Sequence, residues 1–542
     1  MQPSPSAHVD TFCRDNLPAE DEWPEMIFDL AGLQYPERLN CAVELLDNVA
    51  DRLGADRPCL LAPGCDPWTY GDLRRVSNQI AAVLTEDHGI VPGNRILLRG
   101  PNNPWLVACW FGAMKAGAVA VTTVPMLREG ELAKIAEIAA ADFAFCDARF
   151  TDVLTSSGIP GLRVVEYGGA SGLTTAIQGK PVDFRAVDTA GDDVALLAFT
   201  SGTTGRPKAT MHFHRDILAV ADTFSAHVLK PAADDVFTGT PPLAFTFGLG
   251  GLVAFPLRAG ASTLLLEKAT PDQLAELIAE HNVTVCFTAP TAYRAMLSSG
   301  KADRLGTLRR AVSAGEHLPA ATWQSLFEAT GLRLIDGIGA TEMLHIFIAS
   351  ADDDIRPGST GRAVPGFVAA VLDEHGNPQP PGTPGRLAVK GPTGCRYLAD
   401  PRQRQYVQSG WNITGDTFIE DADGYFWYQA RSDDMIVSSG YNIAGPEVEE
   451  ALLAHPDVTE CGVVGLPDDE RGQLVTAFVV LRGGVDDNER IASQLQEFVK
   501  QRIAPYKYPR RVVFLNQLPK TPTGKLQRHR LPDLVPHPTA GV

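Results

Sequence analysis

Hydrophobic residues along this chain alternate between two spacings, one typical of amphipathic helices and one typical of short buried strands. The most regular stretches predict helices at 72–84, 131–141 and 273–281 and strands at 95–99, 262–266 and 283–287. Strands that alternate with helices at this interval indicate α/β layers with largely parallel sheets. The apolar stretch 105–125 contains glycines and the charged Lys115, which favours a buried helix followed by a strand over a membrane span.

The pattern changes twice towards the C-terminus. Beyond Gly358, short strands are separated by turns such as Pro381-Gly382 and Asp423-Gly424, which indicates a β-rich subdomain. A new pattern follows Asp433, with helices predicted at 448–454 and 491–503 and strands at 460–464 and 474–481. We therefore predict a large domain over residues 1–432 and a small α+β domain over residues 433–542.

Composition narrows the class of protein. The 542 residues are too many for one compact core, and the nine cysteines form no CxxC pair and no Cys/His ligand spacing. A disulfide framework and a structural zinc site are therefore disfavoured, and the N-terminus has no secretory signal, so we expect a cytoplasmic protein. The net charge of −18 disfavours nucleic acids and membranes as partners, so an anionic ligand would need local cations.

A loop rich in hydroxyls, glycines and cations follows the apolar run 194–199, which predicts a buried strand ending in a turn. Glycines allow backbone N–H groups to face an anion, and the hydroxyls and cations add further donors. The loop predicts a polyphosphate site formed by Thr200, Ser201, Gly202, Thr203, Thr204, Gly205, Arg206 and Lys208. It is not the P-loop of common NTPases, because that motif is absent and Pro207 directly precedes the lysine.

Three further segments carry candidate chemistry. The glycine-rich run 336–342 ends in Thr341 and Glu342, and a carboxylate next to phosphates is a natural Mg²⁺ ligand. Asp416, expected at a tight turn, would accept both hydroxyls of a ribose. The loop 520–525 presents Lys525 near the C-terminus. Each segment alone is also compatible with an ordinary loop.

In this order and spacing, the four segments resemble the adenylate-forming superfamily of acyl-CoA synthetases, peptide-synthetase adenylation domains and luciferases. The resemblance extends over nearly the whole chain, from the helix near Leu45 to Lys525. It implies a large N-terminal domain of layered α/β sheets with a β-rich subdomain. It also implies a small, mobile C-terminal α+β lid domain that pivots at Asp433.

The resemblance also implies how the matching residues act on ATP and Mg²⁺. The loop 200–208 would hold the β- and γ-phosphates, Thr341 would contact the α-phosphate, and Glu342 would hold Mg²⁺. Lys525 would bridge the acyl carboxylate and the α-phosphate. The adenosine would be held by Ser313, Ala314, Gly315, Glu316, Asp336, Gly337, Asp416 and Arg431.

Enzymes of this superfamily work in two half-reactions. The carboxylate attacks the α-phosphate and expels pyrophosphate, and the thiol of coenzyme A then replaces AMP. For the second half, the resemblance implies that the lid rotates and presents Ser439, Gly440 and Tyr441 to a pantetheine tunnel.

An acyl pocket is expected after the strand 235–240. Phe245, Phe247 and Tyr293 would sandwich a planar ring by stacking, and Thr246 or His345 would bind a substituent next to the carboxylate. The complete predicted set is Phe245, Thr246, Phe247, Tyr293, Gly339, His345 and Ile346.

Two sequence segments indicate an aromatic acid as the substrate. The runs 211–216 and 336–347 resemble aryl-CoA ligases of the benzoate and 2-aminobenzoate type, and Val437 stands where benzoate ligases usually carry a lysine. We therefore expect a 2-aminobenzoate-type ligase that uses ATP, CoA and a small aromatic acid. A medium-chain acyl-CoA synthetase and an enzyme that loads a carrier protein are the alternatives, and monomer and homodimer are both open.

Replacing Gly440 by leucine should obstruct the predicted pantetheine tunnel and leave the ATP site unchanged. We expect adenylation, measured by pyrophosphate exchange, to stay intact and thioester formation with CoA to be abolished. An equal loss of both half-reactions would contradict this role of Gly440.

Overall fold

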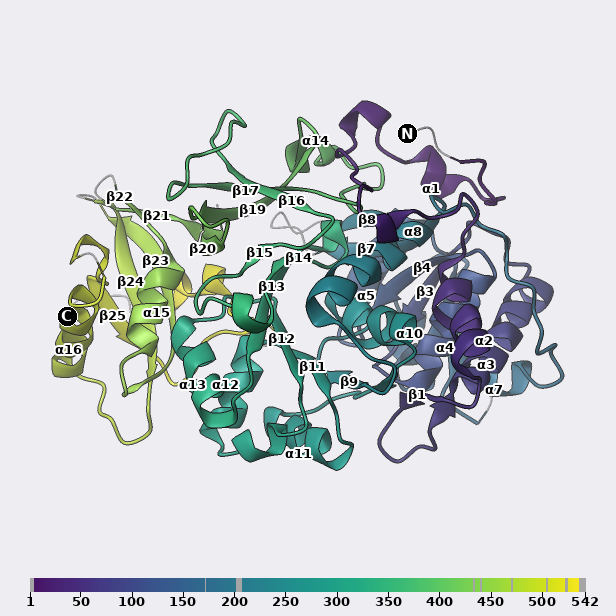
Figure 1. The fold of residues 1–542 in the computed structure, drawn as a ribbon, viewed down its shortest axis with the longest axis horizontal. Helices are drawn as coiled ribbons and strands as arrows, with labels where there is room; N and C mark the ends of the chain where they lie inside the picture. The colour runs from purple at the N-terminus through teal and green to yellow at the C-terminus, as the bar shows by residue number, and fades with distance from the viewer. Residues whose placement is uncertain are drawn as a thin grey trace.

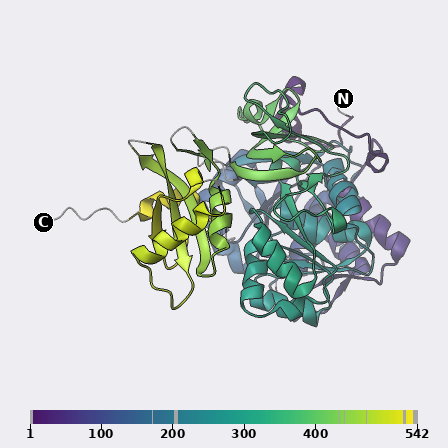
Figure 2. The same ribbon diagram turned by 60° about the vertical axis from the view of Figure 1, so that its left-hand side comes forward.

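The computed structural model describes residues 4–170, 172–200, 207–431, 434–438, 441–468, 471–503, 505–521 and 525–535. Layered sheets and helices make up its larger part, and the elements after residue 434 form a smaller part beside it (Figure 1, Figure 2).

The first sheet is parallel apart from one edge. Its strands are β3 (Arg95–Arg99), β4 (Val119–Thr123), β5 (Phe143–Asp147), β6 (Arg163–Tyr167), β7 (Val194–Thr200) and β8 (Lys208–Phe213). They run in the order β6-β5-β3-β4-β7-β8, and only β7 and β8 are antiparallel. Strand β3 is buried along its whole length, as expected for a covered parallel sheet. The helices α3 (Tyr70–Ala82), α4 (Pro104–Lys115) and α5 (Glu129–Ala139) confirm the helices predicted here.

The second sheet supplies the strand ends around which the site is built. Its strands are β1 (Pro58–Leu61), β2 (Trp68–Thr69), β9 (Val236–Gly239), β10 (Ser262–Leu264), β11 (Val285–Thr288), β12 (Arg310–Ala314), β13 (Leu334–Gly339), β14 (Ile346–Ala349) and β15 (Arg362–Ala363). The order is β15-β14-β13-β12-β11-β9-β10-β1-β2, parallel from β13 to β1. The helices α11 (Pro271–Glu280), α12 (Pro290–Ser298) and α13 (Ala320–Thr330) pack against it through a shared apolar cluster. Ligands of parallel sheets bind beyond the carboxyl ends of the strands, and the predicted segments follow β9, β11, β12 and β13.

A third, antiparallel sheet follows, as the Gly/Pro turns predicted. It contains β16 (Val368–Leu372), β17 (Pro384–Lys390), β18 (Val407–Gln408), β19 (Trp411–Glu420) and β20 (Phe426–Arg431). The C-terminal part has its own sheet and apolar core. Its elements are β21 (Ile436–Ser438), β22 (Tyr441–Ile443), α15 (Gly445–Leu453), β23 (Val458–Asp468), β24 (Gly472–Leu481), α16 (Glu489–Lys500) and β25 (Arg511–Phe514).

Short helices complete the described chain. They are α1 (Phe12–Asp15), α2 (Asn48–Leu53), α6 (Thr151–Thr155), α7 (Leu173–Ala176), α8 (His214–Val220), α9 (Thr246–Leu249), α10 (Phe255–Ala259) and α14 (Gln403–Tyr406). The stretch 105–125 forms α4 and β4, as predicted. Within the described ranges, no helix combines the length and the apolar character that crossing a membrane requires.

Several histidine rings lie away from water in this fold. Burial lowers the pKa of His212 to about 4 and the pKa of His214 and His345 to about 3. An unfolded histidine has a pKa of about 6.5, so the folded chain binds fewer protons than the unfolded chain between these values. The free energy of unfolding is therefore not reduced by these histidines above the unfolded pKa, and it decreases as the pH falls towards 4.

We expect the urea midpoint of unfolding, followed by tryptophan fluorescence, to fall as the pH is lowered from 7.5 to 4.5. His345→Phe, which replaces an imidazole surrounded by phenyl rings, should reduce this decrease because it removes one proton-binding group from the unfolded chain. An identical decrease in the variant would show that His345 does not contribute.

Candidate active site

The predicted phosphate loop connects β7 to β8, with Thr200 opposite Lys208 in the antiparallel register. These two residues therefore stand at the two ends of the loop. The Thr200 hydroxyl is buried and has no hydrogen-bond partner among the described residues, so a ligand could provide one. Residues 201–206 lie outside the described residues, and with them the predicted Ser201, Gly202, Thr203, Thr204 and Gly205.

Lys208 and Glu342, which are predicted to bind phosphate and Mg²⁺, lie close together. The Lys208 Nζ is 3.7 Å from Glu342 Oε1 and donates a hydrogen bond of 2.8 Å to the Tyr397 hydroxyl. The Tyr397 hydroxyl in turn donates to Glu342 Oε1. Burial, with the added effect of Glu342, raises the pKa of Tyr397 well above its ordinary value, so this hydroxyl stays protonated. Tyr397 thus bridges the phosphate-loop lysine and the candidate metal ligand.

Buried polar contacts fix the backbone around this bridge. The neutral His212 ring on β8 donates from Nε2 to the Thr341 carbonyl at 2.8 Å. Arg396, directly before Tyr397, forms a fully buried ion pair of 2.8 Å with Asp216 on α8. Because Arg396 is the neighbour of Tyr397 in sequence, its buried ion pair with Asp216 also anchors the backbone at Tyr397.

The predicted adenine residues meet at the ends of two neighbouring strands. Ser313 pairs with Asp336 and Ala314 with Gly337 in the register of β12 and β13. Three side-chain oxygens here are buried without a partner in the described part of the chain, namely Ser313 Oγ, Glu316 Oε1 and Asp336 Oδ1. Burial raises the pKa of Glu316 and of Asp336.

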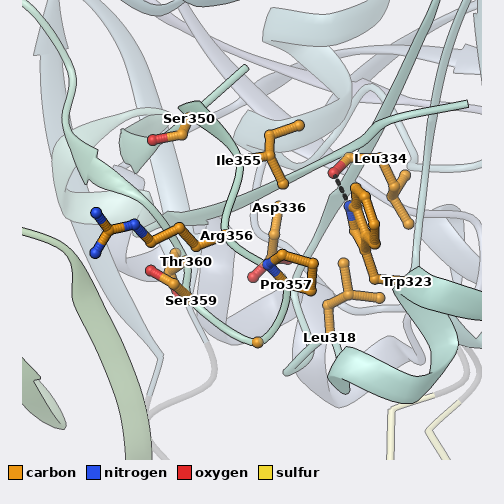
Figure 3. A pocket seen from close by; sticks show the side chains of 11 residues that line it. Leu318, Trp323, Leu334, Asp336, Ser350, Ile355, Arg356, Pro357, Ser359 and Thr360 are labelled. Carbon is orange, nitrogen blue, oxygen red and sulfur yellow. Dashed lines mark hydrogen bonds between the residues drawn. The ribbon is translucent and has the colours of Figure 1, made fainter. Parts of the chain in front are cut away.

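Asp336 also lines a small cavity beside these strands, together with Trp323, Ser359 and Thr360 (Figure 3). Unsatisfied buried polar atoms are costly, so their concentration at these strand ends indicates a site for a polar ligand.

Asp416 lies in the middle of β19, and the prediction of a tight turn is wrong. It is paired in register with Arg431 on β20, and its Oδ1 lies 3.4 Å from Arg431 Nη1. The preceding Gly415 has a φ of +78°, and the register shifts here, so the glycine makes a β-bulge. Burial raises the pKa of Asp416, and Arg431 opposes this rise. The predicted ribose pair is therefore brought together on a bulged strand.

Lys525 extends from the C-terminal part to the predicted adenine loop. A Cβ atom placed on Gly315 would lie 3.4 Å from Lys525 Cε and 3.7 Å from its Nζ. The hydroxyl of Thr521 accepts from the Lys525 N–H, which anchors the start and end of the loop 521–525. Desolvation lowers the pKa of Lys525, and the nearby carboxylate of Glu316 opposes this.

The other residues predicted to act in the lid are described only in part. Asp433, Ser439 and Gly440 lie outside the described residues. Tyr441 begins β22, opposite Ser438 on β21.

Phe247 and His345, both predicted to line an acyl pocket, are part of an aromatic box that surrounds the His345 ring. The centre of the imidazole lies 5.6 Å from the ring centre of Phe247 and 4.5 Å from that of Phe255. The ring centres of Phe224 and Phe287 lie 5.5 and 6.3 Å away. Neither ring nitrogen of His345 has a hydrogen bond of ordinary geometry within the described part. Burial lowers its pKa to about 3, against a smaller opposing effect of the Phe247 backbone. The box therefore contains a neutral, polar group.

Two glycines leave room for His345, Gly250 for its ring and Gly339 for its backbone. A Cβ atom on Gly250 would lie 2.3 Å from His345 Cδ2, and one on Gly339 would lie 2.7 Å from the His345 carbonyl oxygen. Ile346, the first residue of β14, packs against Gly337 in the same way. Thr246 begins α9 next to Phe247 and is half-buried.

The structure does not form the predicted sandwich of three aromatic rings. Phe245 is 40% exposed. Tyr293 on α12 is fully buried in the cluster beneath the sheet, where its single hydroxyl proton is shared between the carbonyls of Cys286 at 3.1 Å and Val312 at 3.3 Å. Tyr293 is therefore a core residue, and its assignment to the acyl pocket is wrong.

Sequence reasoning missed Tyr397 and three aromatic residues of the box, Phe224, Phe255 and Phe287. Tyr397 lies in an irregular segment, and the phenylalanines come from separate elements with ordinary core patterns. No local signal distinguishes them, because only the tertiary packing brings them to His345.

Family models and known proteins match this chain over most of its length. The family model described as AMP-binding enzyme matches residues 46–397, and that of the AMP-binding enzyme C-terminal domain matches residues 447–525. A benzoate–CoA ligase of Thauera aromatica is 32% identical over 92% of this chain and 97% of its own length.

Two solved structures are similar over almost their whole length. The anthranilate CoA ligase AuaEII, in complex with anthranoyl-AMP, has a TM-score of 0.88 and 33% identity, covering 93% of this chain and 98% of its own. A benzoate CoA ligase from Burkholderia xenovorans LB400 has a TM-score of 0.84 and 31% identity, with 91% and 99% covered.

Tyr397→Phe keeps the ring under Lys208 but removes the hydroxyl that links Lys208 to Glu342. We expect kcat/KM for ATP in pyrophosphate exchange to fall about tenfold, the effect of losing hydrogen bonds to charged groups. Tyr406→Phe is the matched control. Its ring lies 5.9 Å from that of Tyr397, and its hydroxyl has no partner among the described residues. Equal losses in the two variants would contradict the bridging role.

Proposed function

Since this chain belongs to the AMP-binding enzyme family and is an AMP-forming acid–thiol ligase, we propose that it activates an aromatic carboxylic acid of the benzoate or 2-aminobenzoate type. The acid is converted to an acyl-adenylate with release of pyrophosphate and then to its CoA thioester with release of AMP. The observation that carries the choice of acid is the aromatic box around His345.

Adenylation joins two anions, so positioning and neutralisation of charge supply most of the catalysis. An oxygen of the acyl carboxylate attacks the α-phosphorus of ATP, and the bond to the β-phosphate oxygen breaks. In our proposal Lys208, with the loop after β7, holds the departing phosphates. Lys525 lies next to Gly315, in the loop predicted to hold the adenine. From there it would neutralise the carboxylate and the α-phosphate.

The donor set at Glu342 suits Mg²⁺ bound to phosphates. Mg²⁺ is usually held by one or two carboxylates together with substrate phosphates and water. Glu342 provides one carboxylate beside Lys208, and the described residues contain no group of three or more metal-ligating side chains. Glu342 would therefore hold the ion together with the nucleotide, and the ion would supply further neutralisation of the phosphate charge.

The second half-reaction removes AMP. The CoA sulfur attacks the acyl carbon of the adenylate, the acyl–oxygen bond to AMP breaks, and the thiol proton is lost to solvent. AMP is a good leaving group, whereas the oxide of a free carboxylate is not, which explains why ATP is needed first.

His345 supports an acid with a polar substituent on the ring. Its neutral imidazole can both donate and accept, and a buried polar group without a partner is costly. An amine or hydroxyl next to the carboxylate of the substrate would satisfy it, whereas unsubstituted benzoate would not. The solved relative with anthranoyl-AMP adds support for the aminobenzoate choice.

A second candidate is a medium-chain acid. An apolar cavity adjoins the acyl segment and is lined mainly by Leu98, Leu106, Trp110, Leu243, Leu249 and Val253. Its apolar lining suits an alkyl chain.

A panel of benzoate, 2-aminobenzoate, 2-hydroxybenzoate and octanoate, each with ATP and free CoA, tests the proposal. We expect the substituted aromatic acids to have the highest kcat/KM. In His345→Phe the preference for 2-aminobenzoate over benzoate should fall about tenfold, because the ring substituent loses its hydrogen-bond partner. Clear preference for octanoate would refute the aromatic acid, and adenylation without transfer to free CoA would indicate a carrier protein as the acceptor.

A further inference from the structure

Helix α13 begins without a capping side chain of its own. Its N-cap residue is Pro319, which provides no side-chain hydrogen bond, so the first N–H groups of the helix depend on other partners. One partner comes from the C-terminal part of the chain: Glu450 Oε1, on α15, accepts from the Ala320 N–H at 3.1 Å. Helices α13 and α15 lie side by side (Figure 1). A carboxylate at a helix N-terminus is also favoured by the helix dipole.

The segment capped by Glu450 is the segment that meets Lys525. Between β12 and α13 the chain passes through Gly315, next to the Lys525 side chain, and reaches Ala320 five residues later. His317, between them, stacks on Tyr428 of β20 with ring centres 5.5 Å apart. The C-terminal part therefore touches both ends of one short, well-supported loop.

Helix α15 is also joined to the segment that carries Lys525. Glu449, next to Glu450, forms an ion pair of 2.8 Å with Arg528, which lies three residues after Lys525. Glu449 also accepts from the Val463 N–H at 2.7 Å. Glu449 thus connects α15 to the segment that carries Lys525, and Glu450 connects α15 to α13.

We propose that Glu450 is a positioning residue for adenylation: by capping α13 from the C-terminal part, it sets Lys525 over the loop between β12 and α13. The proposal rests on the proposed function only in assigning adenylation to Lys525. Attack of a thiol on an adenylate that is already formed does not need the carboxylate–phosphate contact. Glu450 therefore acts on the first half-reaction and not on the second.

The test separates the two half-reactions in two variants and one control. Glu450→Ala removes the acceptor, and Glu450→Gln keeps an oxygen that can accept from Ala320. Glu447→Ala is the control, because Glu447 lies on the same helix but pairs with Lys507 at 2.6 Å, within the C-terminal part. Pyrophosphate exchange measures adenylation, and single turnover of preformed aryl-adenylate with CoA measures the second step.

We expect adenylation by Glu450→Ala to fall roughly tenfold, in line with the loss of a helix N-cap. The second step should stay within about twofold of wild type, and Glu450→Gln should recover most of the activity. Unchanged adenylation in Glu450→Ala, an equal loss in both steps, or the same loss in Glu447→Ala would each overturn the proposal.

Hydrogen–deuterium exchange gives a readout that is independent of the reaction. The amide of Ala320 should exchange faster in Glu450→Ala than in wild type, and at the wild-type rate in Glu447→Ala. Unchanged exchange in Glu450→Ala would overturn the capping contact itself. If wild type forms no aryl-adenylate, the proposed function fails, and the exchange result still decides whether the cap exists.

Discussion

Electrostatic repulsion between a carboxylate and a polyphosphate is the constraint that organises this site, and it is severe in a chain with a net charge of −18. Local cations oppose this repulsion, and each of them lies near a carboxylate. Lys208 lies beside Glu342 and Arg431 beside Asp416, and the carboxylate of Glu316 partly opposes the lowering of the Lys525 pKa by desolvation. Each cation is therefore partly neutralised before ligands bind, which limits the cost of removing it from water when they do.

The same constraint explains why polar and charged side chains are buried next to the site. Tyr397 can bridge Lys208 and Glu342 only if its own segment is rigid, and the Arg396–Asp216 pair provides this rigidity in the interior. A buried pair of this kind adds little to stability but is strongly destabilising when one partner is removed. We infer that its role here is to hold the backbone directly before Tyr397 in place.

Much of the fold could be predicted because it depends on apolar periodicity. Strands such as β3 and helices such as α11 have regular patterns, and the order of the motifs was enough to indicate the family. Strand β8 was not predicted, because its buried His212 is polar and interrupts the apolar pattern that identifies strands. Asp416 was placed at a turn for a related reason: Gly415 signals a bend, and a local sequence does not distinguish a bulge within a strand from a turn.

The proposed acyl pocket shows the limit of prediction from local sequence. Phe247 and His345 were predicted from motifs, whereas Phe224, Phe255 and Phe287 reach the same imidazole from separate elements. Tyr293 follows β11 closely in sequence, but the direction of its side chain on α12 turns it into the core beneath the sheet. The space for the imidazole is created by a residue without a side chain, Gly250. Because a larger residue there would displace His345, the shape of this pocket depends on the glycine as much as on the aromatic rings.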